Sequence, residues 1–174
     1  MIFTRKYWLY IKINNMNTII PEHLSSSFIL SEFLNNERHI RIACRNNNCN
    51  YIAKLLEVTR NKSATGPMDE NEKFQYDAVR NEIIMSDLSS QLGIGPKVHD
   101  ISLNRIEGYI VMDRYDGTLE DLIGLYKTND MIPVDLYMEH VWRLLNVLHQ
   151  NNIIHGDFSS SNIFLHKNRE VCHC

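Results

Sequence analysis

The residues between His155 and Asn162 have the types and the spacing that phosphoryl-transfer chemistry requires. They read His-Gly-Asp-Phe-Ser-Ser-Ser-Asn and follow the apolar pair Ile153-Ile154. An aspartate in such a loop receives or orients the proton of an attacking hydroxyl, and an asparagine five residues later offers an amide oxygen to a magnesium ion. An Asx-turn explains either residue alone, but not both at this spacing before the apolar run Ile163–Leu165. Asp157 and Asn162 are therefore the firmest candidates.

A lysine in an apolar stretch upstream is the next candidate. Lys54 lies in Tyr51–Leu56, which is typical of the second strand of a hairpin whose first strand is Arg38–Arg45 and whose turn is Asn46–Asn48. A buried ammonium group needs an acidic partner, because an unpaired one loses its proton or destabilises the fold. The alternative is an exposed lysine on an edge strand, where it discourages pairing with another chain.

A long helix after these strands carries the acids that can pair with Lys54. The stretch Asp69–Leu92 has acidic residues in its first turn, apolar residues at helical spacing and a glycine after its end. Glu82 shares a helix face with small and apolar neighbours, so it is the preferred partner. Asp77 and Glu72 are competing acids, and a solvated acidic face is the remaining alternative.

These residues together resemble the protein kinase superfamily, in the His-Gly-Asp form found in kinase-like proteins of large DNA viruses. The resemblance covers residues 28 to 174. In that family a lysine of the third strand holds the α- and β-phosphates of ATP and pairs with a glutamate of the following helix. The resemblance implies ATP and Mg²⁺ as cofactors, with Lys54 and Glu82 at the ATP phosphates. It also implies Asp157 as the catalytic residue and Asn162 as the metal ligand.

The strand candidate Glu107–Tyr115 resembles the fifth strand and hinge of the same family. By that match Met112 takes the gatekeeper position, and the backbone of Asp113 and Tyr115 meets the edge of the adenine. Phe164, two residues after the metal ligand, would lie on the floor of the nucleotide pocket. Backbone groups do the binding at a hinge, so an unrelated strand and turn would look much the same.

The resemblance and the order of elements imply an α+β fold of protein kinase type. We expect an N-terminal extension over 1–27 and an antiparallel-sheet N-lobe over 28–115, with a long helix at about 69–92. A partial, mainly helical C-lobe over 116–174 would end after the catalytic loop. Its expected helices are Leu119–Tyr126, capped by Thr118, and one that begins near Pro133 and ends near Gln150.

Three departures from the family pattern weaken the expected activity. Phe33–Ile40 contains no glycine where the family places three, and Glu37 within it would repel phosphates. Ile52 replaces the small alanine that roofs the adenine. The chain stops twelve positions after Asn162, before an Asp-Phe-Gly motif, which suggests a truncated or frame-disrupted product. The apolar stripe of 134–150 would then lack part of its cover, so we expect either aggregation or a partner there.

The expected function is ATP-dependent transfer of a phosphoryl group to serine or threonine hydroxyls of a protein substrate, impaired by these departures. One alternative is a pseudokinase or decoy that binds a partner kinase or its regulator without catalysis. The other is a small-molecule phosphotransferase, because antibiotic and choline-type kinases share the fold and use similar loops. The hairpin lysine and the Ser-rich loop favour a protein kinase.

Composition sets the remaining limits. A net charge of −3 over 174 residues gives no electrostatic reason to expect nucleic acid or a membrane as the partner, and no apolar run reaches the roughly 20 residues of a membrane span. The four cysteines, with no export signal, suggest reduced thiols in the cytoplasm. Cys172-His173-Cys174 with His166 is a poor zinc signature, so ordinary thiols are the better interpretation.

Overall fold

The computed structural model describes residues 20–25, 27–34, 39–58, 66–126, 134–155, 157–165 and 171–173. The chain divides into two compact units. The first, called here the sheet unit, consists of Asn17–Gln91 and Pro96–Arg114. The second, called the loop unit, consists of Leu92–Gly95 and the described residues from Tyr115 onward. Each unit is described by itself.

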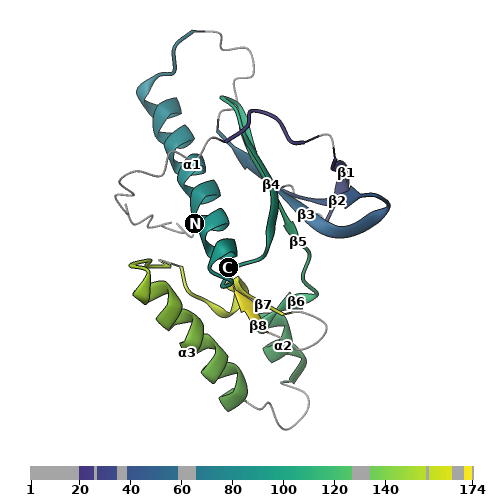
Figure 1. Cartoon of the computed structure of the whole chain (residues 1–174), viewed down its shortest axis with the longest axis vertical. Coiled ribbons are helices and arrows are strands. Elements are labelled where there is room, and N and C mark those ends of the chain that lie inside the picture. Colours follow the sequence, from purple (N-terminus) through teal and green to yellow (C-terminus); the bar gives the residue numbers. More distant parts are fainter. Residues whose placement is uncertain are drawn as a thin grey trace. The chain divides into compact units, whose positions relative to one another are not determined.

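The sheet unit contains a five-stranded antiparallel sheet with one long helix along it (Figure 1). The strand order is β1-β2-β3-β5-β4. The strands are β1 (Ile29–Phe33), β2 (Ile40–Arg45), β3 (Asn48–Glu57), β4 (Val98–Leu103) and β5 (Glu107–Asp113), and the helix is α1 (Glu70–Gln91). The expected α+β class, with an antiparallel sheet and a long helix after the first strands, is confirmed.

The core of the sheet unit lies between α1 and one face of the sheet. Successive side chains of β5 point to opposite faces, so Ile110 and Met112 pack with Val79 and Ile83 of α1, while Val111 packs on the other face. Val79 and Ile83 are four residues apart and therefore lie on one side of the helix. Ile83, Ile110 and Val111 are fully buried.

Gly108 allows α1 to approach β5 closely. A Cβ atom at this position would lie 3.0 Å from Val79 Cγ1, 3.1 Å from Ile83 Cδ1 and 3.2 Å from Leu103 Cδ1. All three are ends of buried side chains, so the surrounding core has little room to yield. The absence of a side chain at Gly108 thus fixes the separation between the helix and the sheet.

Replacing Gly108 with alanine should destabilise the sheet unit by about 1–3 kcal/mol, because the added methyl overpacks this contact. Urea unfolding followed by circular dichroism measures the change. Gly66→Ala is the matched control, since a Cβ there meets nothing within 4 Å and its expected effect is within about 0.5 kcal/mol. Equal stability of the two variants would contradict the close approach.

The start of α1 is set by a reciprocal capping box. Asp69 Oδ1 accepts a hydrogen bond from the backbone N–H of Glu72 at 2.8 Å, and Glu72 Oε2 accepts one from the backbone N–H of Asp69 at 3.3 Å. After the helix, Gly93 has φ +67°, a left-handed conformation that glycine adopts without strain. These signals place the ends of α1 close to the predicted range of 69–92.

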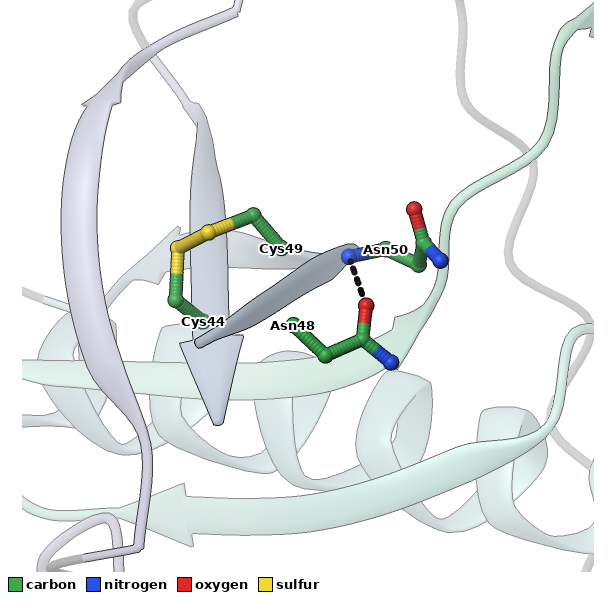
Figure 2. The surroundings of a disulfide bond; sticks show 4 residues. All are labelled: Cys44, Asn48, Cys49 and Asn50. Atoms are coloured by element: carbon green, nitrogen blue, oxygen red, sulfur yellow. Dashed lines mark hydrogen bonds between the residues drawn. A yellow bond between two sulfur atoms is a disulfide. The ribbon is translucent and has the colours of Figure 1, made fainter. Parts of the chain in front are cut away.

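A disulfide joins Cys44 and Cys49 across the β2–β3 hairpin (Figure 2). Asn46 and Asn47 form the two-residue turn with φ values of 52° and 63°, and Arg45 pairs with Asn48 beside it. Cys44 and Cys49 each lie one position further from the turn, where the register shifts between Ala43 and Arg45, and their Cα atoms are 4.0 Å apart. The expectation of reduced thiols is wrong for this pair, because the hairpin brings the two cysteines within bonding distance of each other.

Reduction of this disulfide should lower the free energy of unfolding by about 2 kcal/mol, because the bond closes a short loop in the unfolded chain. Denaturant titration with and without a reductant measures the difference. The Cys44→Ser/Cys49→Ser variant should have the same free energy of unfolding as the reduced protein, and the reductant should not change it. Intact mass after alkylation should show two more modified thiols once the protein is reduced, and an equal count in both states would refute the bond.

Both outer strands of the sheet have local protection. At one edge, the backbone N–H of Leu103 in β4 donates to the carbonyl of Pro21 at 2.7 Å, so part of the segment assigned by sequence to an N-terminal extension lies against this strand. At the other edge, the register of β1 on β2 shifts between Leu30 and Phe33. The guanidinium of Arg41 bridges the shift by donating to the carbonyl of Ser31 at 2.9 and 2.7 Å.

The loop unit combines two helices with a small antiparallel sheet. The helices are α2 (Leu119–Tyr126) and α3 (Val134–Gln150), close to the ranges predicted from the sequence. The sheet has the order β6-β7-β8, with β6 (Gly117–Thr118), β7 (Ile163–Leu165) and β8 (Val171–His173), and the 3₁₀ turn η1 (Ser160–Asn162) precedes β7. This three-stranded sheet was not predicted from the sequence.

Within the described part of the chain, no helix combines the length and the apolar composition needed to cross a membrane.

Candidate functional site

Lys54 lies on β3, the central strand of the sheet unit, and forms an ion pair with α1. Its Nζ atom is 2.6 Å from Oε1 of Glu82. In register, Lys54 is flanked by Ile40 of β2 and Ile110 of β5. The structure therefore brings together two residues that the sequence placed on a strand and on the following helix.

The register removes the edge-strand interpretation of Lys54, because β3 has a hydrogen-bonded neighbour on each side. The ion pairs also show which of the competing acids contacts Lys54. Glu72 pairs instead with Arg105, whose Nη2 atom lies 2.7 Å from Glu72 Oε2. Glu82, ten residues further along α1, is the acid that contacts Lys54.

The ion pair is unequally exposed. The Lys54 side chain is 43% exposed and the Glu82 side chain 17%. A pair this open to water adds only about 0–1 kcal/mol to stability. The more buried carboxylate of Glu82 nevertheless needs a positive partner in place of the lost water. The arrangement thus holds an ammonium group at the surface in a fixed orientation while contributing little to folding.

Asp157 and Asn162 lie together in the loop unit. The side-chain Nδ2 of Asn162 donates to the backbone carbonyl of Asp157 at 2.7 Å and to its Oδ2 at 3.2 Å. This use of Nδ2 turns the amide oxygen of Asn162 to the other side of the group. The backbone N–H of Asn162 donates to the carbonyl of Ser159 at 3.0 Å, which closes η1. The loop thus presents an exposed carboxylate with an amide fixed beside it.

The end of α3 leads directly into this loop. Asn152 has φ 57°, a left-handed conformation that stops the helix, and the N–H of Ile153 donates back to the carbonyl of Leu148 at 2.9 Å. The side chain of Ile153 is buried and anchors the chain before the loop. His155 then packs edge-on against Phe158 with ring centroids 5.8 Å apart, as expected of a structural histidine.

The residues predicted at the adenine are divided between the two units. Met112 and Asp113 end β5 in the sheet unit, and Met112 is buried in the core below α1. The backbone N–H of Asp113 donates to the carbonyl of Lys97 at 3.0 Å. Tyr115 and Phe164 belong to the loop unit, where their ring centroids are 5.9 Å apart. No finding tests the nucleotide contacts predicted for these four residues.

The side chain of Asp113 has a contact that the sequence did not indicate. Its Oδ1 lies 2.6 Å from Nε2 of His99. His99 in turn packs edge-on against Tyr51, with ring centroids 4.8 Å apart, and lies near Phe28. This cluster is on the face of the sheet away from α1, and it fixes the end of β5 through a side chain while the backbone is held by Lys97.

Thr118 and Asp121 form a second capping box, at the start of α2. Asp121 Oδ2 accepts from the backbone N–H and from the hydroxyl of Thr118, both at 2.8 Å, and Thr118 Oγ1 accepts from the N–H of Asp121 at 3.2 Å. The backbone hydrogen bond from Thr118, and then the hydroxyl, lower the pKa of the Asp121 carboxyl below 3.8. The cap fixes the chain between β6 and α2, and β6 pairs with β7 directly after Asn162.

The Asp121 cap should make stability depend on acid pH. Because the folded pKa is lowered, the cap stabilises fully above the unfolded value and is lost as pH falls through the folded value. Asp121→Asn should therefore lower the melting temperature at about pH 6, with a deficit that shrinks toward about pH 3. Glu120→Gln removes a charge from the same turn and should show no such pH-dependent deficit. A deficit independent of pH would contradict the assignment.

Several sequence predictions fall outside the described residues. Four residues of the glycine-free stretch, 35–38, lie there, although the hairpin around them is closed by the N–H of Leu34 donating to the carbonyl of Ile40 at 2.9 Å. His166 and Cys174 also lie outside, as does the side chain of Cys172. Among the residues that are described, no group of three or more His, Cys, Asp or Glu is placed to hold a metal.

The apolar stripe of α3 is mostly covered. Val141, Leu144 and Leu148 are buried, and Val141 packs with Ile163 of β7. Among the side chains of this helix that the structure describes, the exposed large apolar ones are instead Met138, 43% exposed, and Trp142, 60% exposed. They are four residues apart and so lie on one helix face. The partner expected for the stripe remains an untested prediction.

A small cavity of about 180 Å³ lies in the sheet unit, on the face away from α1. Tyr109 contributes to it, and burial, followed by the nearby charge of Glu107, raises the pKa of the Tyr109 phenol. None of the predicted site residues lines this cavity, whose lining consists of Glu22, His23, Leu24, Leu30, Ser102, Asn104, Glu107 and Tyr109.

Comparison with known proteins relates part of the chain to protein kinases. No model of a known protein family matches the sequence. A segment of 66 residues is 39% identical to part of mitogen-activated protein kinase kinase kinase 4 of Mus musculus, and the same values hold for the protein of that name of Homo sapiens. The match covers 37% of this chain but only 4% of each relative. The chain therefore corresponds to a small part of these proteins.

Proposed function

We propose that this chain binds ATP with Mg²⁺ and takes part in protein kinase-like transfer of a phosphoryl group to serine or threonine hydroxyls. The observation that carries the proposal is the ion pair between Lys54 on a central strand and Glu82 on the following helix. Its support comes from the loop with Asp157 and Asn162 and from the partial match to a protein kinase. Substrate and activity are part of the proposal.

In this proposal Lys54 neutralises the α- and β-phosphates of ATP. Glu82 holds the Lys54 ammonium in one orientation, with Oε1 only 2.6 Å from Nζ. Since nearly half of the Lys54 side chain is exposed, the amine can contact a ligand without leaving its carboxylate. The low contribution of such a pair to stability agrees with a role in binding.

Asp157 would accept or orient the proton of the attacking hydroxyl. Its carboxylate is exposed, and the Asn162 amide donates to Oδ2, which fixes the orientation of the group. The reacting proton would be taken by a carboxylate oxygen within hydrogen-bond reach of the substrate hydroxyl. The surrounding turn is tied by backbone hydrogen bonds, so the carboxylate is held in place before substrate arrives.

The donor set of this loop fits Mg²⁺ in chemistry. Mg²⁺ prefers oxygen ligands and is commonly bound through one or two protein groups together with phosphate oxygens. Asn162 would provide its amide oxygen, and the adjacent carboxylate of Asp157 adds negative charge. Bound Mg²⁺ would neutralise charge on the phosphates. Met112, Asp113, Tyr115 and Phe164 are the residues proposed for the adenine.

Two substitutions test nucleotide binding and phosphoryl transfer separately: Lys54→Met tests binding, and Asp157→Asn tests transfer. With Mg-ATP at about 100 times its Kd, the unaltered protein should gain about 2.7 kcal/mol of stability. Lys54→Met should remove most of that gain, whereas Lys97→Met, an exposed lysine of the same unit, should keep it. Thermal unfolding with and without Mg-ATP measures both. A gain unchanged by Lys54→Met would overturn the assignment of the phosphate site.

Asp157→Asn should retain nucleotide binding but lower the rate of phosphoryl transfer about 10²–10⁴-fold, the usual contribution of a positioned general base. Radiolabelled ATP with a panel of protein and small-molecule hydroxyl substrates measures the rate. Asp77→Asn, an acid of α1, serves as the control and should leave the rate unchanged. Label on small molecules alone would favour a small-molecule phosphotransferase.

A non-catalytic binding module is the second candidate, and one observation favours it. The stretch Phe33–Ile40 contains no glycine, so its backbone amides are hindered from closing over phosphates. Absence of any stabilisation by Mg-ATP at millimolar concentration would select this candidate, a pseudokinase or decoy that binds a partner protein.

A further inference from the structure

One turn of the sheet unit contacts both elements that carry the Lys54–Glu82 pair. This turn, Asn104–Ile106, joins β4 to β5. The backbone N–H of Val58, just after β3, donates to the carbonyl of Ile106 at 2.9 Å. The guanidinium of Arg105, the middle residue of the turn, reaches the start of α1. The same three residues thus hold the strand of Lys54 and the helix of Glu82.

Arg105 contacts the beginning of α1 at three points. Its Nη2 donates to Glu72 Oε2 at 2.7 Å and to the carbonyl of Pro67 at 3.4 Å, and its Nη1 donates to the carbonyl of Gly66. The Glu72 carboxylate also receives the N–H of Asp69 in the capping box. We call these contacts the Arg105 clamp. They tie the chain before the helix and the first helical turn to one guanidinium.

The clamp is partly shielded from water. The Arg105 side chain is 25% exposed and that of Glu72 is 16% exposed. Charge-assisted hydrogen bonds are strong under such conditions. The Nε atom of Arg105 is buried and has no hydrogen-bond partner among the described residues, so the guanidinium is oriented by its Nη contacts. The guanidinium thus holds the start of α1 through its Nη atoms, although its Nε–H group makes no hydrogen bond within the described part of the chain.

The turn that carries the clamp is itself rigid. Asn104 Oδ1 accepts from the backbone N–H groups of Ile106 at 2.8 Å and Glu107 at 3.0 Å. The N–H of Asn104 donates to the carbonyl of Glu107 at 2.9 Å, and Asn104 Nδ2 donates to the carbonyl of Glu22 at 3.4 Å. A turn fixed in this way transmits its position to whatever it binds.

We propose that Arg105 is a positioning residue for the Lys54–Glu82 pair, acting through Glu72. The clamp and the Val58–Ile106 hydrogen bond grip the connection between β3 and α1 at both of its ends. Glu82 lies ten residues after Glu72, about 15 Å along a helix that moves as a stiff body. Releasing the start of α1 therefore shifts the carboxylate away from Lys54. An effect of Arg105 on ATP binding rests on the proposed function. The effect of Arg105 on the geometry of the Lys54–Glu82 pair does not.

The chemical reactivity of Lys54 tests this proposal without nucleotide. An amine-acylating reagent and peptide mass spectrometry give the modification rate of each lysine. Glu82→Gln sets the reference for a broken pair. Arg105→Ala and Glu72→Gln should each raise the rate at Lys54 by about two- to fivefold, the range that matches loss of a half-exposed ion pair. The rate at Lys97, on the same unit, should stay constant in each variant.

Two comparisons separate positioning from general stability. Arg45→Ala removes an arginine whose guanidinium lies 5.5 Å from the ring centroid of Phe28, on the other face of the sheet, and should leave Lys54 unchanged. Arg105→Lys, which keeps the charge but loses the forked contacts, should give an intermediate rate. If Arg105→Ala fails to fold, the nearly isosteric Glu72→Gln decides the question. A normal Lys54 rate in Glu72→Gln, despite a lowered melting temperature, would overturn the proposal.

Protection of Lys54 by Mg-ATP in the unaltered protein is measured in the same experiment. Its absence would count against the proposed function alone, because the rates in the nucleotide-free variants would still report on the clamp.

Discussion

The close approach of α1 to β5 at Gly108 is the constraint on which the sheet unit depends. It brings Val79 and Ile83 into the core, and Glu82 lies directly before Ile83 in the sequence. Because side chains on a helix have fixed directions, seating Ile83 in the core sets where Glu82 can point. This packing is one of the conditions for the ion pair with Lys54. Apolar contacts thus position a polar pair that adds little stability of its own.

Local sequence signals sufficed for the elements that carry the candidate residues. Period-two alternation in Arg38–Arg45 predicted β2, and helical spacing with a following glycine predicted α1. Thr118 was predicted to cap one helix and Gln150 to end another, and the structure confirms both. The order of strands and the burial of Ile110 and Val111 depend on pairing between distant segments, which local patterns do not specify.

In the candidate site, too, contacts between predicted elements were foreseen, whereas contacts without a local sequence signal were not. Lys54 and Glu82 were proposed as partners from their positions on a strand and a helix, and the structure brings them within 2.6 Å. Arg105 gave no signal, because its partner Glu72 is 33 residues away in the sequence. The Cys44–Cys49 bond was missed for a different reason. The number of cysteines and the absence of an export signal do not indicate this bond, whereas the two asparagines of the turn, which bring the strands on either side together, do.

The edges of the five-stranded sheet have a consequence for how this unit can meet other molecules. An exposed strand normally offers its backbone as a template for a further strand. Here the chain at Pro21 occupies a backbone group of β4, and the register shift in β1 interrupts the regular spacing that an incoming strand would have to match. Sheet extension is therefore disfavoured at both sides. Recognition by this unit would have to proceed through side chains on its faces, where substitutions can tune affinity one residue at a time.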